Sequence, residues 1–241
     1  MYYVYRPAVY QPNLFLIAAA VIPAVLLLIY VYKADRLEKE PASLLGVLLL
    51  QGIISTALAA YAERIGAKVL NGFLSDESLL YQLLFNFLVV GFAEEGFKFL
   101  LLKWRTWRSP HFNCQFDGVV YAVFVSLGFA LWENIDYVFM YGFGTAVLRA
   151  VTAIPGHACF GVFMGAWYGL AKAHEKKGNA EHCRTCKRLA LLCPVLLHGL
   201  YDFIASIEEI DTTCIFVGFI LLMFAAAYLT IRRLSQQDRY L

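Results

Sequence analysis

Seven apolar segments, each long enough to cross a lipid bilayer, constrain the fold of this chain more than any other feature. A bilayer core about 30 Å thick requires about 20 apolar residues in helical conformation. Hydrophobic residues make up 61% of the 241 residues, a content that is high for a soluble domain. The sequence therefore predicts an all-α, polytopic membrane protein in which residues 1–241 form a single integral membrane domain. The predicted spans are residues 13–32, 43–62, 79–102, 117–140, 147–171, 188–206 and 214–231.

The basic residues predict how the helices are oriented. Fifteen lysines and arginines lie in the loops after the first, third and fifth spans and in the C-terminal tail, whereas the opposite side has only Arg6, Arg64 and Lys68. By the positive-inside rule, the N-terminus is expected outside and the C-terminus in the cytoplasm. The opening "MYYVYRPAVYQPN" lacks the basic start of a secretory signal, so the first span is expected to remain in the protein. The net charge of +2 and the dispersed basic residues give no indication of a nucleic-acid partner.

Charged residues lie at the centre of the third span, in "FAEEGFKFL". Ionisable groups at membrane depth cost several kcal/mol unless they are paired or face a wet cavity, so each indicates function. Glu94 and Lys98 are four residues apart and share a helix face, which predicts an internal ion pair. Glu95 lies about 100° further round the helix and is expected to point elsewhere.

The fifth span, "LRAVTAIPGHACFGVFMGAWYGL", combines a histidine with a stripe of small residues. Arg149, Ala153 and His157 follow one another at intervals of four on a single predicted helix face. Glycines continue the same stripe at positions 161, 165 and 169. Small residues with this spacing let a neighbouring helix approach closely, so His157 is predicted to face another helix and not lipid.

Two further spans carry carboxylates. The fourth span contains "FALWE", which ends in Glu133, and Asp136 follows near its predicted outer end. The sixth contains "HGLYD", in which His198 and Asp202 are four residues apart and share a face. A carboxylate so close to an imidazole can fix its tautomer and raise its basicity. Peptide hydrolysis requires an activated water, an oxyanion donor and an acid for the leaving amine, and glutamates with histidines can supply all three.

Four motifs together resemble the PrsW family of intramembrane glutamic-type proteases, which is similar to the CAAX prenyl endopeptidase and Abi superfamily. The motifs are "EEGFK", "FALWE" with Phe129 and Glu133, "PGH" ending in His157, and "HGLYD". They occur in the family's order, within a motif core at residues 79–206. The resemblance implies that Glu94 activates water with support from Glu95 and Lys98. It also implies that His157 and His198 polarise the substrate or transfer protons, and that Asp202 orients His198.

The site residues expected on this basis fall into two groups. The catalytic group is Glu94, Glu95, Glu133, His157 and His198, and the supporting group is Lys98, Phe129, Arg149 and Asp202. The CAAX enzymes have histidine where this chain has Glu133 and asparagine where it has Asp202, which leaves open whether Glu133 takes part in water activation. No cofactor is expected, although two histidines and three glutamates could hold zinc.

The resemblance also implies a substrate and a location. Family members cleave single-pass membrane proteins, and an anti-sigma factor is the expected substrate, cut first in envelope-stress signalling at the plasma membrane of a bacterium. Two alternatives remain from the residues alone: a proton-coupled transporter, because buried Glu, His and Lys also build proton relays, and a non-catalytic scaffold. No inverted repeat of the kind found in many carriers is visible.

The pair Cys183 and Cys186 in "HCRTC" has the spacing of a metal or redox motif. It falls between predicted spans, so we expect a solvated cytosolic loop with reduced thiols. A zinc site would need about four ligands, for which His174 and His182 are the nearest candidates in sequence.

Overall fold

The computed structural model describes residues 14–207 and 211–241, and these residues form helices without any strand. The predicted all-α membrane bundle is therefore confirmed. Arg6 and the first residue of the first predicted span lie outside the described residues. The elements are α1 (Leu14–Ala34), α2 (Ala42–Asn71), α3 (Leu79–Leu84), the π-helix η1 (Phe85–Gly91), α4 (Phe92–Thr106), α5 (Asp117–Tyr141), α6 (Phe143–Val151), α7 (Ala153–Lys176), α8 (Ala180–Ser206) and α9 (Thr213–Gln236).

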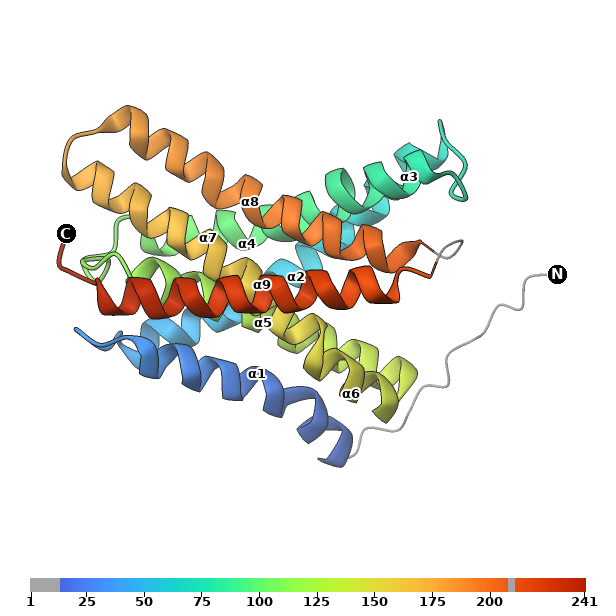
Figure 1. Cartoon of the computed structure of the whole chain (residues 1–241), viewed down its shortest axis with the longest axis horizontal. Coiled ribbons are helices and arrows are strands. Elements are labelled where there is room, and N and C mark those ends of the chain that lie inside the picture. The colour runs from blue at the N-terminus through green and yellow to red at the C-terminus, as the bar shows by residue number, and fades with distance from the viewer. Residues whose placement is uncertain (1–13, 208–210) are drawn as a thin grey trace.

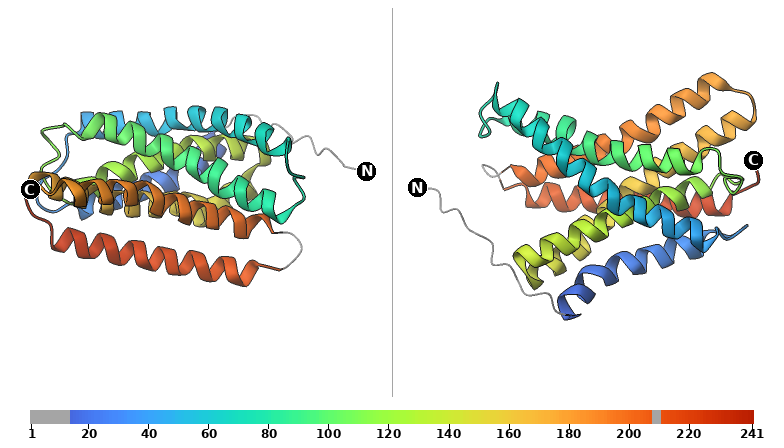
Figure 2. Two further views of the ribbon diagram at one scale, coloured as in Figure 1. Left: turned by 90° about the horizontal axis from the view of Figure 1, so that it is seen from above. Right: turned by 180° about the vertical axis from the view of Figure 1, so that it is seen from behind.

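The helices run along the long axis of the molecule, and the start of α1 and the end of α9 lie at opposite ends (Figure 1). Seen from above, α9 lies along one edge of the bundle and α2 along the opposite edge (Figure 2). Within the described residues, six helical segments are long and apolar enough to cross a membrane. The protein is thus a multi-pass membrane protein, and the side of the membrane that each end faces stays a prediction.

The third predicted span is assembled from three shorter pieces, α3, η1 and α4, which have 6, 7 and 15 residues. No one of them alone is long enough to cross a membrane. Phe85 and Gly91 at the two junctions keep helical backbone angles, so the pieces form one continuous path over residues 79–106. A π-helix adds one residue to each turn and commonly marks a functional site. Here it immediately precedes the turn that carries Glu94 and Glu95.

The fifth predicted span is broken, contrary to expectation. Thr152 has φ −121° and ψ −76°, which ends α6 and separates it from α7. Pro155 lies in the first turn of α7, where the missing amide of a proline is tolerated. The predicted continuous helix through Arg149, Ala153 and His157 is therefore wrong, although the three residues still face one side, where they line the same cavity.

The predicted solvated loop around Cys183 and Cys186 is also wrong. Gly178, with φ +74°, makes the turn after α7, and α8 then begins at Ala180. Both cysteines are buried in the first turns of α8 and pack against Ala171 of α7. The region is thus a tight α7–α8 helical hairpin.

Close helix contacts through glycines build the core around α5, of whose 25 residues 15 are buried. A Cβ placed on Gly128 would lie 2.2 Å from the Leu49 carbonyl oxygen of α2, and one on Gly169 would lie 2.0 Å from the Gln115 carbonyl oxygen. On α7, Gly161 and Gly165 contact α5 in the same way. The predicted small-residue stripe thus packs within the monomer and brings α7, with its histidine, against α5.

Replacing Gly165 by alanine is expected to destabilise the protein by about 2 kcal/mol, the usual cost of overpacking a core. The new Cβ would lie 2.4 Å from both the Gly118 oxygen and the Val119 Cα, and backbone atoms cannot move aside separately from their helix. Thermal unfolding in detergent micelles measures the effect. Gly218→Ala is the control, since no atom lies within 4 Å of a Cβ at that position. Equal unfolding temperatures for the two variants would contradict the packing described.

Candidate active site

η1, which leads directly into the glutamates of α4, packs closely against α8, which carries His198. A Cβ on Gly91 would lie 3.0 Å from the Val195 oxygen, and one on Gly199 would lie 2.9 Å from the Phe87 Cα. Both distances are shorter than those that most side chains keep from their neighbours. Without side chains between them, the two backbones come close enough for the carboxylates of α4 to reach His198 of α8.

Lys98 lies at the centre of the site and is fully buried. Its Nζ is 3.1 Å from Glu94 Oε2, 2.7 Å from Glu95 Oε1 and 3.1 Å from His157 Nδ1. The Phe129 ring covers the ammonium, with its centroid 3.7 Å from Nζ. Glu95 shares this lysine with Glu94 although the two lie about 100° apart round the helix, since a long lysine side chain reaches partners at both i−3 and i−4.

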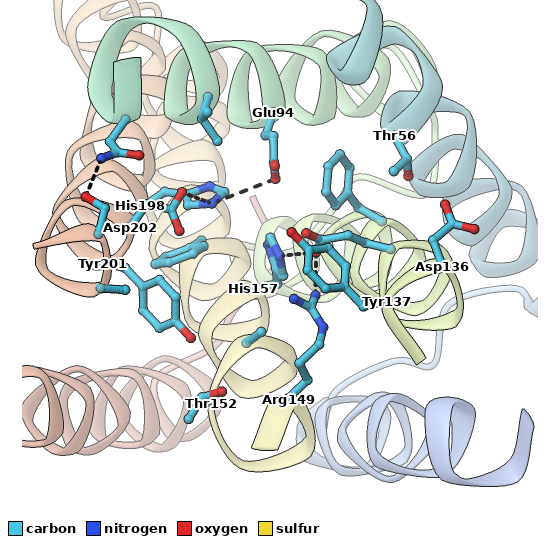
Figure 3. A pocket seen from close by; sticks show the side chains of 18 of the residues that line it. Thr56, Glu94, Asp136, Tyr137, Arg149, Thr152, His157, His198, Tyr201 and Asp202 are labelled. Atoms are coloured by element: carbon cyan, nitrogen blue, oxygen red, sulfur yellow. Dashed lines mark hydrogen bonds and ion pairs between the residues drawn. The ribbon is translucent and has the colours of Figure 1, made fainter. Parts of the chain in front are cut away.

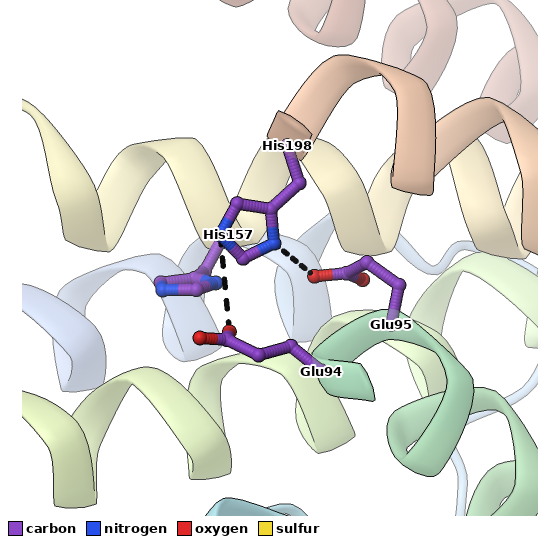
Figure 4. Close-up of side chains that lie close together, drawn as sticks. All are labelled: Glu94, Glu95, His157 and His198. Carbon is purple, nitrogen blue, oxygen red and sulfur yellow. Dashed lines mark hydrogen bonds and ion pairs between the residues drawn. The ribbon is translucent and has the colours of Figure 1, made fainter. Parts of the chain in front are cut away.

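His198 is surrounded by carboxylates (Figure 4). Its Nδ1 lies 2.9 Å from Glu95 Oε1, and its Nε2 lies 3.2 Å from Asp202 Oδ2 and 3.8 Å from Glu94 Oε2. Carboxylates only accept hydrogen bonds, so this arrangement favours a ring that carries a proton on each nitrogen. The predicted contact between His198 and Asp202 is present.

His157 links the lysine to a second carboxylate. An ammonium can only donate, so Nδ1 accepts from Lys98 and the ring proton is assigned to Nε2. That nitrogen is 3.0 Å from Glu133 Oε2, which also accepts from Arg149 Nη2 at 2.8 Å. Arg149 comes from the separate helix α6, and its guanidinium also donates to Asn134 at 3.0 Å. All nine predicted site residues therefore belong to one connected cluster, despite the break at Thr152.

A cavity of about 750 Å³ adjoins this cluster. Glu94, His157, His198 and Arg149 point into it (Figure 3). Glu95 is fully buried and, like Lys98, is not among the residues that line the cavity, so the two neighbouring glutamates have different environments. Of these two neighbouring glutamates, only Glu94 is accessible to a water or a peptide in the cavity.

The cavity also has polar lining residues that the motifs do not include. Glu63 of α2 and Asn86 of η1 were not anticipated, and Asp136 was expected near the outer interface. Asn86 donates to the Ser206 hydroxyl at 3.0 Å and so ties η1 to the end of α8. Glu63 directly follows the predicted span 43–62, where a charged residue is ordinary. None of the four motifs lies on α2.

The site does not fit a metal ion with Lys98 in its observed position. Within the described residues, one ligand atom from each of Glu94, Glu95, His157 and His198 can be chosen so that all four lie within 4.8 Å of one another. However, the Lys98 ammonium contacts three of these four side chains and supplies a positive charge among them. A zinc ion would have to displace a buried cation that already holds these groups together. Cys183 and Cys186 do not belong to the group.

The fold and the site together define a polytopic membrane protein with a carboxylate and imidazole centre enclosed between its helices. The family model described as "PrsW family intramembrane metalloprotease" matches residues 40–229. The chain therefore belongs to the PrsW family and is a membrane-embedded protease. The resemblance stated from the four motifs is confirmed.

Curated relatives are similar in sequence to this chain over most of its length. Protease PrsW of Halalkalibacterium halodurans is 33% identical over 225 residues, which cover 93% of this chain and 99% of the relative. The protein of the same name from Clostridioides difficile is 35% identical over 81% of this chain and 80% of its own length. The Bacillus subtilis protein is 33% identical over 79% and 83%, respectively. No solved structure matches the chain significantly.

Proposed function

We propose that this protease cleaves single-pass membrane proteins in the cavity beside Glu94, and that an anti-sigma factor in the plasma membrane of a bacterium is its substrate. The position of the paired glutamates carries the proposal. Glu94 lines the cavity and has a side chain 8% exposed, whereas Glu95 is enclosed behind it. A general base must reach the water it activates, so Glu94 takes that role.

The reaction begins when Glu94 accepts a proton from water and the water oxygen attacks the substrate carbonyl carbon. The resulting oxyanion needs a hydrogen-bond donor, and His198 Nε2, 3.8 Å from Glu94 Oε2, supplies an N–H beside the reacting carbonyl. His198 then gives a proton to the leaving amine as the C–N bond breaks, and the proton on Glu94 restores the histidine. Asp202 and Glu95 orient the ring and stabilise its positive form.

Glu133 has a positioning role in this proposal. Its Oε2 is already bound to Arg149 and to His157, which leaves it poorly placed to activate water. His157 in turn accepts a hydrogen bond from Lys98 and so fixes the position of the ammonium beside Glu94. No step requires a metal ion. Membership of a protease family favours catalysis over the scaffold and transporter alternatives.

The function is tested by reconstituting the purified protein in liposomes with a panel of single-pass reporters that includes anti-sigma factors. We expect cleavage by the wild type, with or without a chelator. His198→Gln should lower the rate by about 10² to 10⁴, the usual contribution of a proton-transferring group. Glu181→Gln, in the first turn of α8, is the control. The proposal would be contradicted if a folded wild type cut no reporter, or if His198→Gln cut at the wild-type rate. Inhibition by the chelator would restore the zinc alternative.

A further inference from the structure

We propose that Glu63 selects substrates with a basic side chain near the scissile bond; this inference rests on the proposed proteolytic function. Glu63 belongs to α2 and follows Thr56 and Ala60 at intervals of four and three residues, so that all three line the catalytic cavity on one helix face. Glu63 therefore places a carboxylate on the wall of the catalytic cavity, and it belongs to a helix that is long enough to span a membrane.

The carboxylates of the catalytic cluster that line the cavity have positive partners. Glu94 is paired with Lys98, Glu133 with Arg149, and Asp202 with His198. The Glu63 side chain makes no hydrogen bond or ion pair with any of the described residues. Arg149 is the only lysine or arginine among the described residues that line the cavity, and it is already bound to Glu133. Glu63 is therefore a carboxylate on the cavity wall with no cation of the described residues in contact with it.

Glu63 is also close enough to the reacting groups to influence which peptide is cut. It lines the same cavity as Glu94 and His198, which are members of the catalytic cluster. A half-buried carboxylate without a positive partner is costly, and a ligand that brings a positive charge offsets that cost. A lysine or arginine of the substrate provides this charge when the peptide occupies the cavity. Asp136 on α5 lines the same chamber and likewise forms no hydrogen bond or ion pair with a described residue.

The test uses a reporter that the wild type cleaves, into which a single lysine is placed at successive positions along the span and its flanks. Methionine at the same position is the uncharged counterpart of similar length. For each position, kcat/KM of the lysine reporter is divided by kcat/KM of the methionine reporter in the same enzyme variant. A general loss of activity cancels in this ratio, and unfolding temperatures verify that each variant is folded.

In the wild type, we expect lysine at one position to raise the ratio about tenfold, as a partly desolvated charge pair would. In Glu63→Gln the ratio at that position should fall to about one. In Glu63→Lys the preference should reverse, so that a reporter with glutamate at that position is cut faster than one with lysine. The control variant Glu181→Gln should keep the wild-type ratio. Two results would overturn the inference. One is a wild-type ratio of about one at every position, as expected if Glu63 carries a proton and is uncharged. The other is a Glu63→Gln variant that keeps the full preference for lysine. Cleavage of the methionine reporters with no charge preference leaves the proteolytic function intact, whereas a wild type that cuts none of the reporters overturns both proposals.

Discussion

Glu94→Gln is expected to lower kcat for a cleavable reporter by about 10³ or more, with little change in KM. The amide has the same shape as the carboxylic acid and its oxygen can still accept from Lys98, but it cannot take a proton from water. The variant loses the general base, which typically contributes a factor of 10² to 10⁴ to the rate. It also loses the negative charge that orients the water. Single-turnover cleavage in liposomes measures the chemical step directly.

Glu95→Gln is the matched comparison, since it makes the same chemical change one residue further along. Glu95 also contacts Lys98 and His198, but it is fully buried behind the cavity. We therefore expect its loss of kcat to be at least about tenfold smaller than that of Glu94→Gln, because it acts through His198 and not on water. A larger loss for Glu95→Gln would reverse the assignment of the two glutamates.

Lys98→Met is expected to destabilise the protein by about 3 to 5 kcal/mol, the usual cost of removing one partner from a buried ion pair. Methionine fills a similar volume, but Glu94 and Glu95 would be left at the centre of the bundle without the cation that both contact. Denaturant unfolding in micelles measures the change in the free energy of unfolding. Activity should fall as well, because the same ammonium fixes His157.

The double variant Glu95→Gln/Lys98→Met separates charge from packing. It removes the 2.7 Å ion pair as a unit, so its loss of stability should be smaller than the sum of the two single losses. Additive losses, or a Lys98→Met variant that is within about 1 kcal/mol of the wild type, would mean that Lys98 does not hold the cluster together.

Features that depend on local spacing were predictable from the sequence. The apolar runs located the helical segments, and intervals of four residues correctly paired Glu94 with Lys98 and His198 with Asp202. Helical periodicity is a property of one segment, so it can be read without knowledge of the neighbouring helices.

Features that depend on how segments meet were not predictable in the same way. The break at Thr152 leaves Arg149 on its own short helix, yet tertiary packing still returns its guanidinium to Glu133. Cys183 and Cys186 appeared to lie in a loop because the polar start of α8 extends beyond the apolar run. Glu63 belongs to no motif, and only the packing of α2 against the cluster shows that it faces the cavity.

The enclosure of α5 limits how this sequence can vary over evolutionary time. Fifteen of its 25 residues are buried, and its contacts through Gly118 and Gly128 leave no room for a single added carbon. By contrast, only five of the 24 residues of α9 are buried. Substitutions that exchange one apolar side chain for another should therefore accumulate on α9 among related chains, whereas α5 should change slowly even at positions distant from Glu133. The rate at which each position changes among related chains would then depend on helix packing as much as on catalysis.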